Sequence, residues 1–323
     1  MAMLRRVLLA AGAVLLLAST AAAQSYPNRP IKVIVPFVPG TGTDTMGRAM
    51  VDAIQPALGQ PMVVENRSGA GGSIGANAVA KAVPDGYTLL ATSAGHAANP
   101  AIHKSLPFDT VEDFVAVAPL AFQPNVLIIA PSRGLKTVQE LVAYGKANPG
   151  KLTYGSAGIG SGTHLNAEKF RNAAGGYDAV HVPYRGSTEA FPDIMTGRTD
   201  YFFSPISAAL QLIRAGNLLA LGVSSAERSP VLPDVPTTVE AGVPNSEFVL
   251  WYGLLAPKGT PREIVQRLHA EVNKALQSAE MKARLGAVGA TPWVATSEQF
   301  HAHIRKEVQD NIKLAAAAGI KPE

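Results

Sequence analysis

The chain has 323 residues, of which 47% are hydrophobic and 16% charged, and it contains no cysteine. This length and composition are typical of a globular protein large enough for two domains. The formal net charge is only +4, and no run of Lys and Arg is interleaved with aromatic residues, so we expect no nucleic-acid partner. Without cysteine, thiolate catalysis, zinc–thiolate sites and disulfides are excluded.

The first 23 residues have the three-part pattern of a secretory signal peptide. Arg5 and Arg6 precede an apolar run over residues 7–18, and a small-residue site, Ala21-x-Ala23, follows. A membrane anchor is the alternative, but the run is shorter than the ~20 residues that a membrane span needs. We therefore predict cleavage between Ala23 and Gln24 and export to the periplasm.

After this segment, strand-like runs rich in Val and Ile alternate with amphipathic helical runs. This alternation predicts an α/β fold whose parallel sheets are built from βαβ units. The first set has a helix over 44–58 that Gly59 ends, another helix opened by GAGGSIGANAVAKAV, and strands at 31–37, 62–66 and 87–93. The second set has strands at 125–131, 152–156, 179–184, 199–204 and 218–225.

Capping patterns mark several helix starts. Thr137 with Glu140 forms a capping box, and Ser204-Pro205 predicts an N-cap followed by proline for a helix that ends at Gly216. The C-terminal third is predicted to be helical, with one helix opened by the box at 260–263 and another after Thr296.

The two α/β sets join near residue 124 and again near residue 247. Two chain crossings between lobes would make a hinge. We predict that 24–124 plus 248–323 form lobe 1, that 125–247 form lobe 2, and that the ligand cleft lies between them.

Four glycine-rich turns lead into predicted helices, two in each lobe. The first N–H groups of a helix lack partners and carry partial positive charge, so such turns favour anions. Tight, well-capped βα turns with no ligand are the simpler interpretation of any one of them. The turns are PGTGTD (39–44), SGAGGSIG (68–75), GSAGIGSGTH (155–164) and YRGST (184–188).

Two enzyme hypotheses compete for these turns. No Walker A string is present, but Gly40-Thr-Gly42 approaches the dinucleotide fingerprint, and Glu65 stands where a ribose-binding acid would lie. Ser161 and His164 are three residues apart, and YGSAG (154–158) resembles G-x-S-x-G with tyrosine in place of the first glycine, which together are weak support for a serine hydrolase. The histidines form no ligand-spaced cluster, so we predict neither a metal nor a cofactor.

Several segments together resemble the Bug family, the extracytoplasmic solute receptors of tripartite tricarboxylate transporters. They cover essentially the whole mature chain in order: YPNRPIKVIVPFVPGTGTD, VVENRSGAGGSIGANAVAKAVPDGYTLL, YGSAGIGSGTHL, HVPYRGS, RSPVLPDVPTTVEAG and GLLAPKGTP. The resemblance implies a two-lobed, type II-like Venus-flytrap fold, each lobe a sheet flanked by helices. It also implies a small organic carboxylate as ligand and a large and a small membrane subunit as partners. We expect a monomer.

The resemblance and the glycine turns together predict a ligand-binding set. Asp44 is expected to cap its helix, and whether Arg185 contacts the ligand stays open. Phe37 and Phe203 are either apolar walls or ordinary core residues. The predicted ligand-binding residues are Phe37, Gly40, Thr41, Gly42, Thr43, Ser93, Ser156, Gly158, Ser161, Thr163, His164, Tyr184, Gly186, Ser187, Phe203 and Ser204.

The ligand class is narrowed by one departure from the family. Many relatives carry an acid where this chain has Ser204, which argues against an amino-acid ligand and leaves a dicarboxylate or an aromatic carboxylate. We expect a transport receptor without catalysis. The alternatives are a secreted α/β enzyme, either a hydrolase or nucleotide-dependent, and a receptor that serves a sensor kinase.

Overall fold

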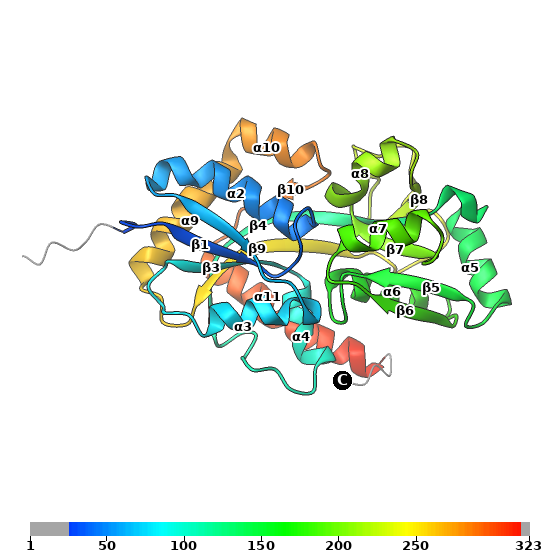
Figure 1. The fold of residues 1–323 in the computed structure, drawn as a ribbon, viewed down its shortest axis with the longest axis horizontal. Coiled ribbons are helices and arrows are strands. Elements are labelled where there is room, and N and C mark those ends of the chain that lie inside the picture. The colour runs from blue at the N-terminus through cyan, green and yellow to red at the C-terminus, as the bar shows by residue number, and fades with distance from the viewer. Residues whose placement is uncertain (1–25, 318–323) are drawn as a thin grey trace, which may run out of the picture.

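The structure is a computed structural model that describes residues 26–317. The predicted signal peptide and its cleavage site lie outside these residues. We use lobe 1 and lobe 2 as names for the two predicted divisions of the chain. Figure 1 shows two α/β bodies side by side, connected by two long strands, β4 (Phe114–Ile129) and β9 (Val249–Pro257).

The sheet of lobe 1 has the strand order β2-β1-β3-β9-β4. Its first three strands, β1 (Ile31–Val35), β2 (Met62–Asn66) and β3 (Thr88–Ser93), are parallel. Its core includes Trp251 and Phe300. The helices of this lobe are α2 (Gly42–Leu58), α3 (Ser73–Ala80), α4 (Gly95–Ile102), α9 (Arg262–Gln277), α10 (Ala279–Gly286) and α11 (Ser297–Ala317), with a 3-10 turn η1 (Ala70–Gly72) and the short strand β10 (Thr291–Pro292).

The sheet of lobe 2 continues from β4 in the order β4-β7-β5-β6, with β8 paired to β4. Hydrophobic clusters cover both of its faces. The strands are β5 (Leu152–Ser156), β6 (Ala179–Pro183), β7 (Tyr201–Pro205) and β8 (Leu219–Val223), and the helices are η2 (Pro131–Arg133), α5 (Val138–Ala147), α6 (Gly162–Ala173), α7 (Ser187–Met195) and α8 (Ile206–Arg214).

The prediction of parallel sheets was wrong for the strands that cross between the lobes. Residues 114–124 of β4 pair antiparallel with β9, and residues 125–129 pair antiparallel with β7 and β8. Strand β9 was missed altogether, because eight of its nine residues are buried and the run therefore lacks alternation. The two strands run in opposite directions because the chain leaves lobe 1 on one and returns on the other.

The predicted helix caps are confirmed at one site and corrected at three. Thr137 accepts the Glu140 N–H, as predicted. The N-cap of α2 is Thr41 and not Asp44. Strand β7 extends through Pro205, which itself precedes α8, and Pro261 precedes α9, so the side chains of Ser204 and Thr260 cap neither helix.

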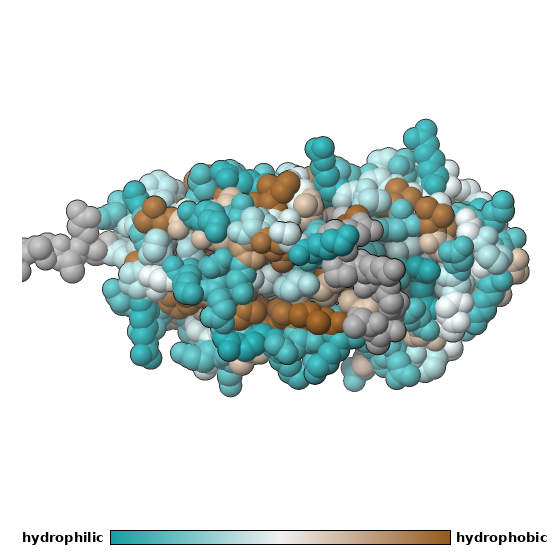
Figure 2. Space-filling model, turned by 90° about the horizontal axis from the view of Figure 1, so that it is seen from below, coloured by the Kyte–Doolittle hydropathy of each residue, from teal (hydrophilic) through white to brown (hydrophobic). Residues whose placement is uncertain are grey.

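The surface is mixed in character. On the face seen from below in Figure 2, hydrophilic residues predominate, and one elongated band of apolar residues lies among them. None of the helices within residues 26–317 combines the length and the apolar character needed to cross a bilayer.

Candidate ligand-binding site

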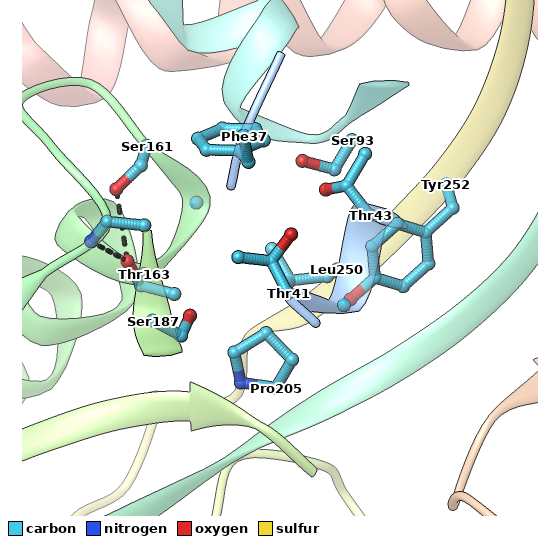
Figure 3. Close-up of a pocket in the computed structure, with 13 residues that line it drawn as sticks. Phe37, Thr41, Thr43, Ser93, Ser161, Thr163, Ser187, Pro205, Leu250 and Tyr252 are labelled. Carbon is cyan, nitrogen blue, oxygen red and sulfur yellow. Dashed lines mark hydrogen bonds between the residues drawn. The ribbon is translucent and has the colours of Figure 1, made fainter. Parts of the chain in front are cut away.

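A small cavity of about 20 Å³ lies between the two lobes. Figure 3 shows its lining side chains converging from both sides. Lobe 1 contributes the start of α2, the end of β3 and part of β9, while lobe 2 contributes the starts of α6 and α7 and the end of β7. The lining residues are Phe37, Thr41, Gly42, Thr43, Ser93, Ala157, Ser161, Gly162, Thr163, Ser187, Pro205, Leu250 and Tyr252.

Three helix N-termini meet at this cavity. Gly42 and Thr43 open α2, Gly162 and Thr163 open α6, and Ser187 opens α7. Within residues 26–317, the backbone N–H groups of these five residues donate to no backbone carbonyl outside their own helices. Because unpaired N–H groups at a helix start carry partial positive charge, the cavity favours an anion.

Two N-cap hydroxyls hold these helix starts in place. Thr41 Oγ1 accepts the Asp44 N–H at 3.4 Å and donates to the Val38 carbonyl at 3.0 Å. Ser161 Oγ accepts the His164 N–H at 3.3 Å. Such caps fix the direction in which the first N–H groups of a helix point.

The cavity is lined by hydroxyl, glycine and apolar residues and contains no charged side chain. No Lys, Arg, Asp, Glu or His is among its lining residues, and Arg185 is exposed elsewhere on the surface. Burial raises the pKa of Tyr252 well above its usual value, so its phenol stays neutral. The Tyr252 hydroxyl donates to Gln123 Oε1 at 3.1 Å. Any anion in this cavity would therefore be held by neutral donors.

Gly40 and Asp44 are bonded to each other beside the cavity. The Gly40 N–H donates to Asp44 Oδ2 at 2.9 Å, and Gly40 does not line the cavity. Arg48 and Asn66 also donate to the Asp44 carboxylate, each at about 3 Å. Burial alone would raise the pKa of Asp44, but the hydrogen bonds from Arg48, Gly40 and Asn66 outweigh it and hold that pKa below its usual value. Asp44 is thus an ionised group that fixes the first glycine turn.

In the glycine turn at 155–164, three predicted donors lie behind the cavity and not on its wall. Gly158 N–H donates to Ser156 Oγ at 3.1 Å, and Gly160 N–H donates to His164 Nδ1 at 3.3 Å. These two glycine N–H groups therefore have their acceptors, Ser156 and His164, within the turn itself. Ser156 is fully buried, and its Oγ also lies 2.6 Å from His181 Nε2.

Four further predicted residues are also placed away from the cavity. The Tyr184 hydroxyl donates to Asp193 at 2.9 Å, and Phe203 packs on Phe170 in the core of lobe 2, with ring centroids 5.1 Å apart. Ser204 is buried and donates to the Pro205 carbonyl. Gly186 is needed for close approach of the lobes, since a Cβ there would lie 2.4 Å from Val38 Cγ2.

The remaining eight predicted residues do line the cavity: Phe37, Thr41, Gly42, Thr43, Ser93, Ser161, Thr163 and Ser187. The sequence analysis missed Ala157, Gly162, Pro205, Leu250 and Tyr252. The apolar run VLWYGLLAP is a signal for a buried strand that would have located the last two.

The residues singled out for the two enzyme hypotheses form ion pairs or hydrogen bonds with other residues of the protein. Glu65, the candidate ribose-binding acid, pairs with Lys32 at 2.9 Å and with Arg67. Ser161 Oγ contacts Thr163 Oγ1 at 3.0 Å and caps α6. Within the described part of the chain, no group of three His, Asp or Glu residues is placed to hold a metal ion.

With this geometry in view, comparison with known proteins identifies the class. Residues 46–320 match the tripartite tricarboxylate transporter family receptor, and the chain belongs to this family. The fold is that of a periplasmic solute-binding protein. The structure of periplasmic binding protein BugD superposes with a TM-score of 0.88 at 32% identity and covers 92% of this chain and 100% of its own.

Two similar solved structures contain ligands. One is Rpa4515 of R. palustris with adipate, with a TM-score of 0.89 at 34% identity over 92% of this chain and 100% of that one. The other is MatC from Rhodopseudomonas palustris with bound malate, with a TM-score of 0.84 at 33% identity over 90% of this chain and 100% of that one. The predicted family and fold class are therefore confirmed.

Proposed function

We propose that this protein captures a small organic carboxylate, either a dicarboxylate or an aromatic carboxylate, between its lobes and delivers it to a tripartite tricarboxylate transporter. The observation that carries the proposal is the meeting of three helix N-termini at one uncharged cavity. The ligands of the two similar structures, adipate and malate, are both dicarboxylates, which supports this class of ligand.

The carboxylate would be bound by neutral donors from both lobes. Gly42 and Thr43 in lobe 1 and Gly162, Thr163 and Ser187 in lobe 2 would supply N–H groups, supplemented by the nearby hydroxyls. Four to six such bonds at ~1.5–3 kcal/mol each contribute roughly 6–18 kcal/mol before costs. Association costs at least ~4 kcal/mol, which leaves a range that includes the ~8 kcal/mol of a micromolar complex.

Reversible binding of this strength suits a transport receptor. A cavity without a buried cation holds no charge that must be neutralised when the ligand leaves, so the lobes can open and release the anion. We propose that a large and a small membrane subunit receive it, that the protein acts in the periplasm as a monomer after cleavage before Gln24, and that it catalyses no reaction.

A thermal-shift screen of residues 24–323 tests the ligand class. The panel contains carboxylates, amino acids, sugars and nucleotides. A ligand at 100 times its dissociation constant stabilises the native state by ~2.7 kcal/mol, which raises the melting temperature by several degrees. We expect shifts with carboxylates only. A shift with NAD or another nucleotide, and none with carboxylates, would overturn the proposal in favour of a nucleotide-binding enzyme.

A further inference from the structure

Two stacked histidines lie behind the glycine turn at 155–164. The rings of His164 on α6 and His181 on β6 are stacked, with centroids 4.2 Å apart and planes inclined by 14°. Tyr154 on β5 stacks on His181 in turn, with ring centroids 4.9 Å apart. Neither histidine lines the cavity. The pair is therefore a support for the turn and not part of the wall that a ligand would touch.

The two imidazoles receive the glycine N–H groups of the turn, one directly and one through a serine. Gly160 N–H donates to His164 Nδ1. Gly158 N–H donates to Ser156 Oγ, which leaves the serine hydroxyl proton free to donate to His181 Nε2, 2.6 Å away. Gly158 has φ +117° and Gly160 has φ +78°, a backbone region that only glycine adopts readily. These hydrogen bonds add to the one from Ala157 N–H to Thr163 Oγ1 at 2.8 Å and the one from Ser161 N–H to the Gly158 carbonyl at 3.0 Å, and together they define the turn.

The Gly160 N–H donates to His164 Nδ1, so that nitrogen lacks a proton. Between Ser156 Oγ and His181 Nε2 either atom can donate, because the serine oxygen can accept a second hydrogen bond, and His181 can take either role in its neutral form. The surroundings of His181 favour this form: burial, with added repulsion from His164 and Arg171, lowers its pKa to about 3. Arg171 itself is paired with Glu168 at 2.7 Å.

We propose that His181 is a positioning residue for carboxylate binding. It does not touch the ligand but fixes, through Ser156 and in contact with His164, the turn that leads into α6. With the N–H groups of Gly158 and Gly160 bonded inward, the free N–H groups at the start of α6, those of Gly162 and Thr163, face the cavity. This inference rests on the proposed function, because it assigns His181 to the same site.

Variants that separate hydrogen bonding from ring stacking test the inference. His181→Phe keeps an aromatic ring without the hydrogen-bonding nitrogen, His181→Gln keeps a hydrogen-bond acceptor without the ring, and Ser156→Ala removes the link. The matched control is His269→Gln, which changes a part-buried histidine of lobe 1 that bonds to the Val117 carbonyl. Isothermal titration with malate and with adipate gives the affinities, and the melting temperature without ligand reports folding.

We expect His181→Phe and Ser156→Ala to bind the dicarboxylate about three- to tenfold more weakly, as follows from the loss of one hydrogen bond. His181→Gln and the control should stay within about twofold of wild type. The Gly158 amide proton should also move upfield in the NMR spectrum of Ser156→Ala, because that variant removes the acceptor of its hydrogen bond.

Two outcomes would overturn the inference, and they can be told apart. If wild type binds carboxylates and His181→Phe and Ser156→Ala bind them equally well, the positioning role is refuted while the proposed function stands. If wild type binds neither these dicarboxylates nor any other carboxylate, the proposed function fails and the inference fails with it. Should His181→Phe not fold, Ser156→Ala alone decides, since it removes only a hydroxyl.

Discussion

Gly42 gives the sharpest test of the cavity, because a single added methyl group would fill part of it. A Cβ at this position would lie 2.3 Å from the Tyr252 hydroxyl oxygen and 2.9 Å from Pro205 Cβ. Favourable non-bonded contacts between carbon atoms are ~3.5–4.0 Å. Gly42 opens α2 and is not among the glycines with positive φ, so its backbone accepts alanine without strain. Gly42→Ala therefore acts on the cavity and not on the helix.

The size of the effect follows from overpacking. Adding a methyl group to a well-packed site costs ~1–3 kcal/mol, which corresponds to about 5- to 150-fold weaker ligand binding. Pro205 belongs to lobe 2 and Gly42 to lobe 1, so opening the lobes relieves that contact. Tyr252 belongs to lobe 1, so the shorter contact persists when the lobes open. The melting temperature of the ligand-free variant should therefore fall by several degrees.

Isothermal titration with malate and adipate measures this effect, with Gly286→Ala as the matched control. Gly286 is the last residue of α10, and a Cβ there meets no atom within 4 Å. The control should bind like wild type. Wild-type affinity in Gly42→Ala would refute the assignment of the ligand to this cavity.

Three further predictions follow from other contacts. Thr43→Ala combined with Ser161→Ala should weaken carboxylate binding by about 2–4 kcal/mol in titration, and unchanged affinity would remove both hydroxyls from the site. Gly71→Ala should abolish the ligand-induced decrease in radius of gyration seen by X-ray scattering, because its Cβ would lie 2.0 Å from the Ile159 carbonyl of lobe 2; compaction equal to that of wild type would contradict this. Burial raises the pKa of Glu307 from 4.5 to about 7, so the stability that this group contributes is fully present below pH 4.5 and is lost as pH rises through 7. With 24% of its side chain exposed, we expect a loss on the order of 1–2 kcal/mol in denaturant titrations, and an equal loss in Glu307→Gln would show that another group titrates.

The strands of βαβ units were predictable from the sequence because their local patterns are strong. The apolar run at 31–37 indicates a strand, and Gly59 indicates the end of the first helix, each from its local sequence alone. Strand β9 was not predictable by alternation, since all of its residues except Val249 are buried and its partners β3 and β4 lie more than a hundred residues away in the chain. Two cavity residues, Leu250 and Tyr252, were missed for that reason.

Eight of the sixteen predicted ligand-binding residues line the cavity, and the other eight lie behind it or away from it. The glycine turns indicated the correct segments, because free N–H groups at helix starts follow from local geometry. Which members of a turn face the ligand depends on tertiary partners that no local pattern reveals. Gly40 is hydrogen-bonded to Asp44, and Ser156 is hydrogen-bonded to His181 of the neighbouring strand. Both residues therefore bond to other parts of the protein and do not line the cavity. Phe203 points to the core because residues on a strand alternate between the two faces of the sheet.

The central claim is that a carboxylate lies against three helix N-termini between the lobes. Backbone ¹H–¹⁵N NMR of residues 24–323, titrated with malate or adipate, tests it most directly. We predict that the amide protons of Gly42, Thr43, Gly162, Thr163 and Ser187 show the largest downfield shifts, because their N–H groups gain an anionic acceptor. Saturable binding whose largest shifts fall elsewhere, with these five amides unchanged, would contradict the account.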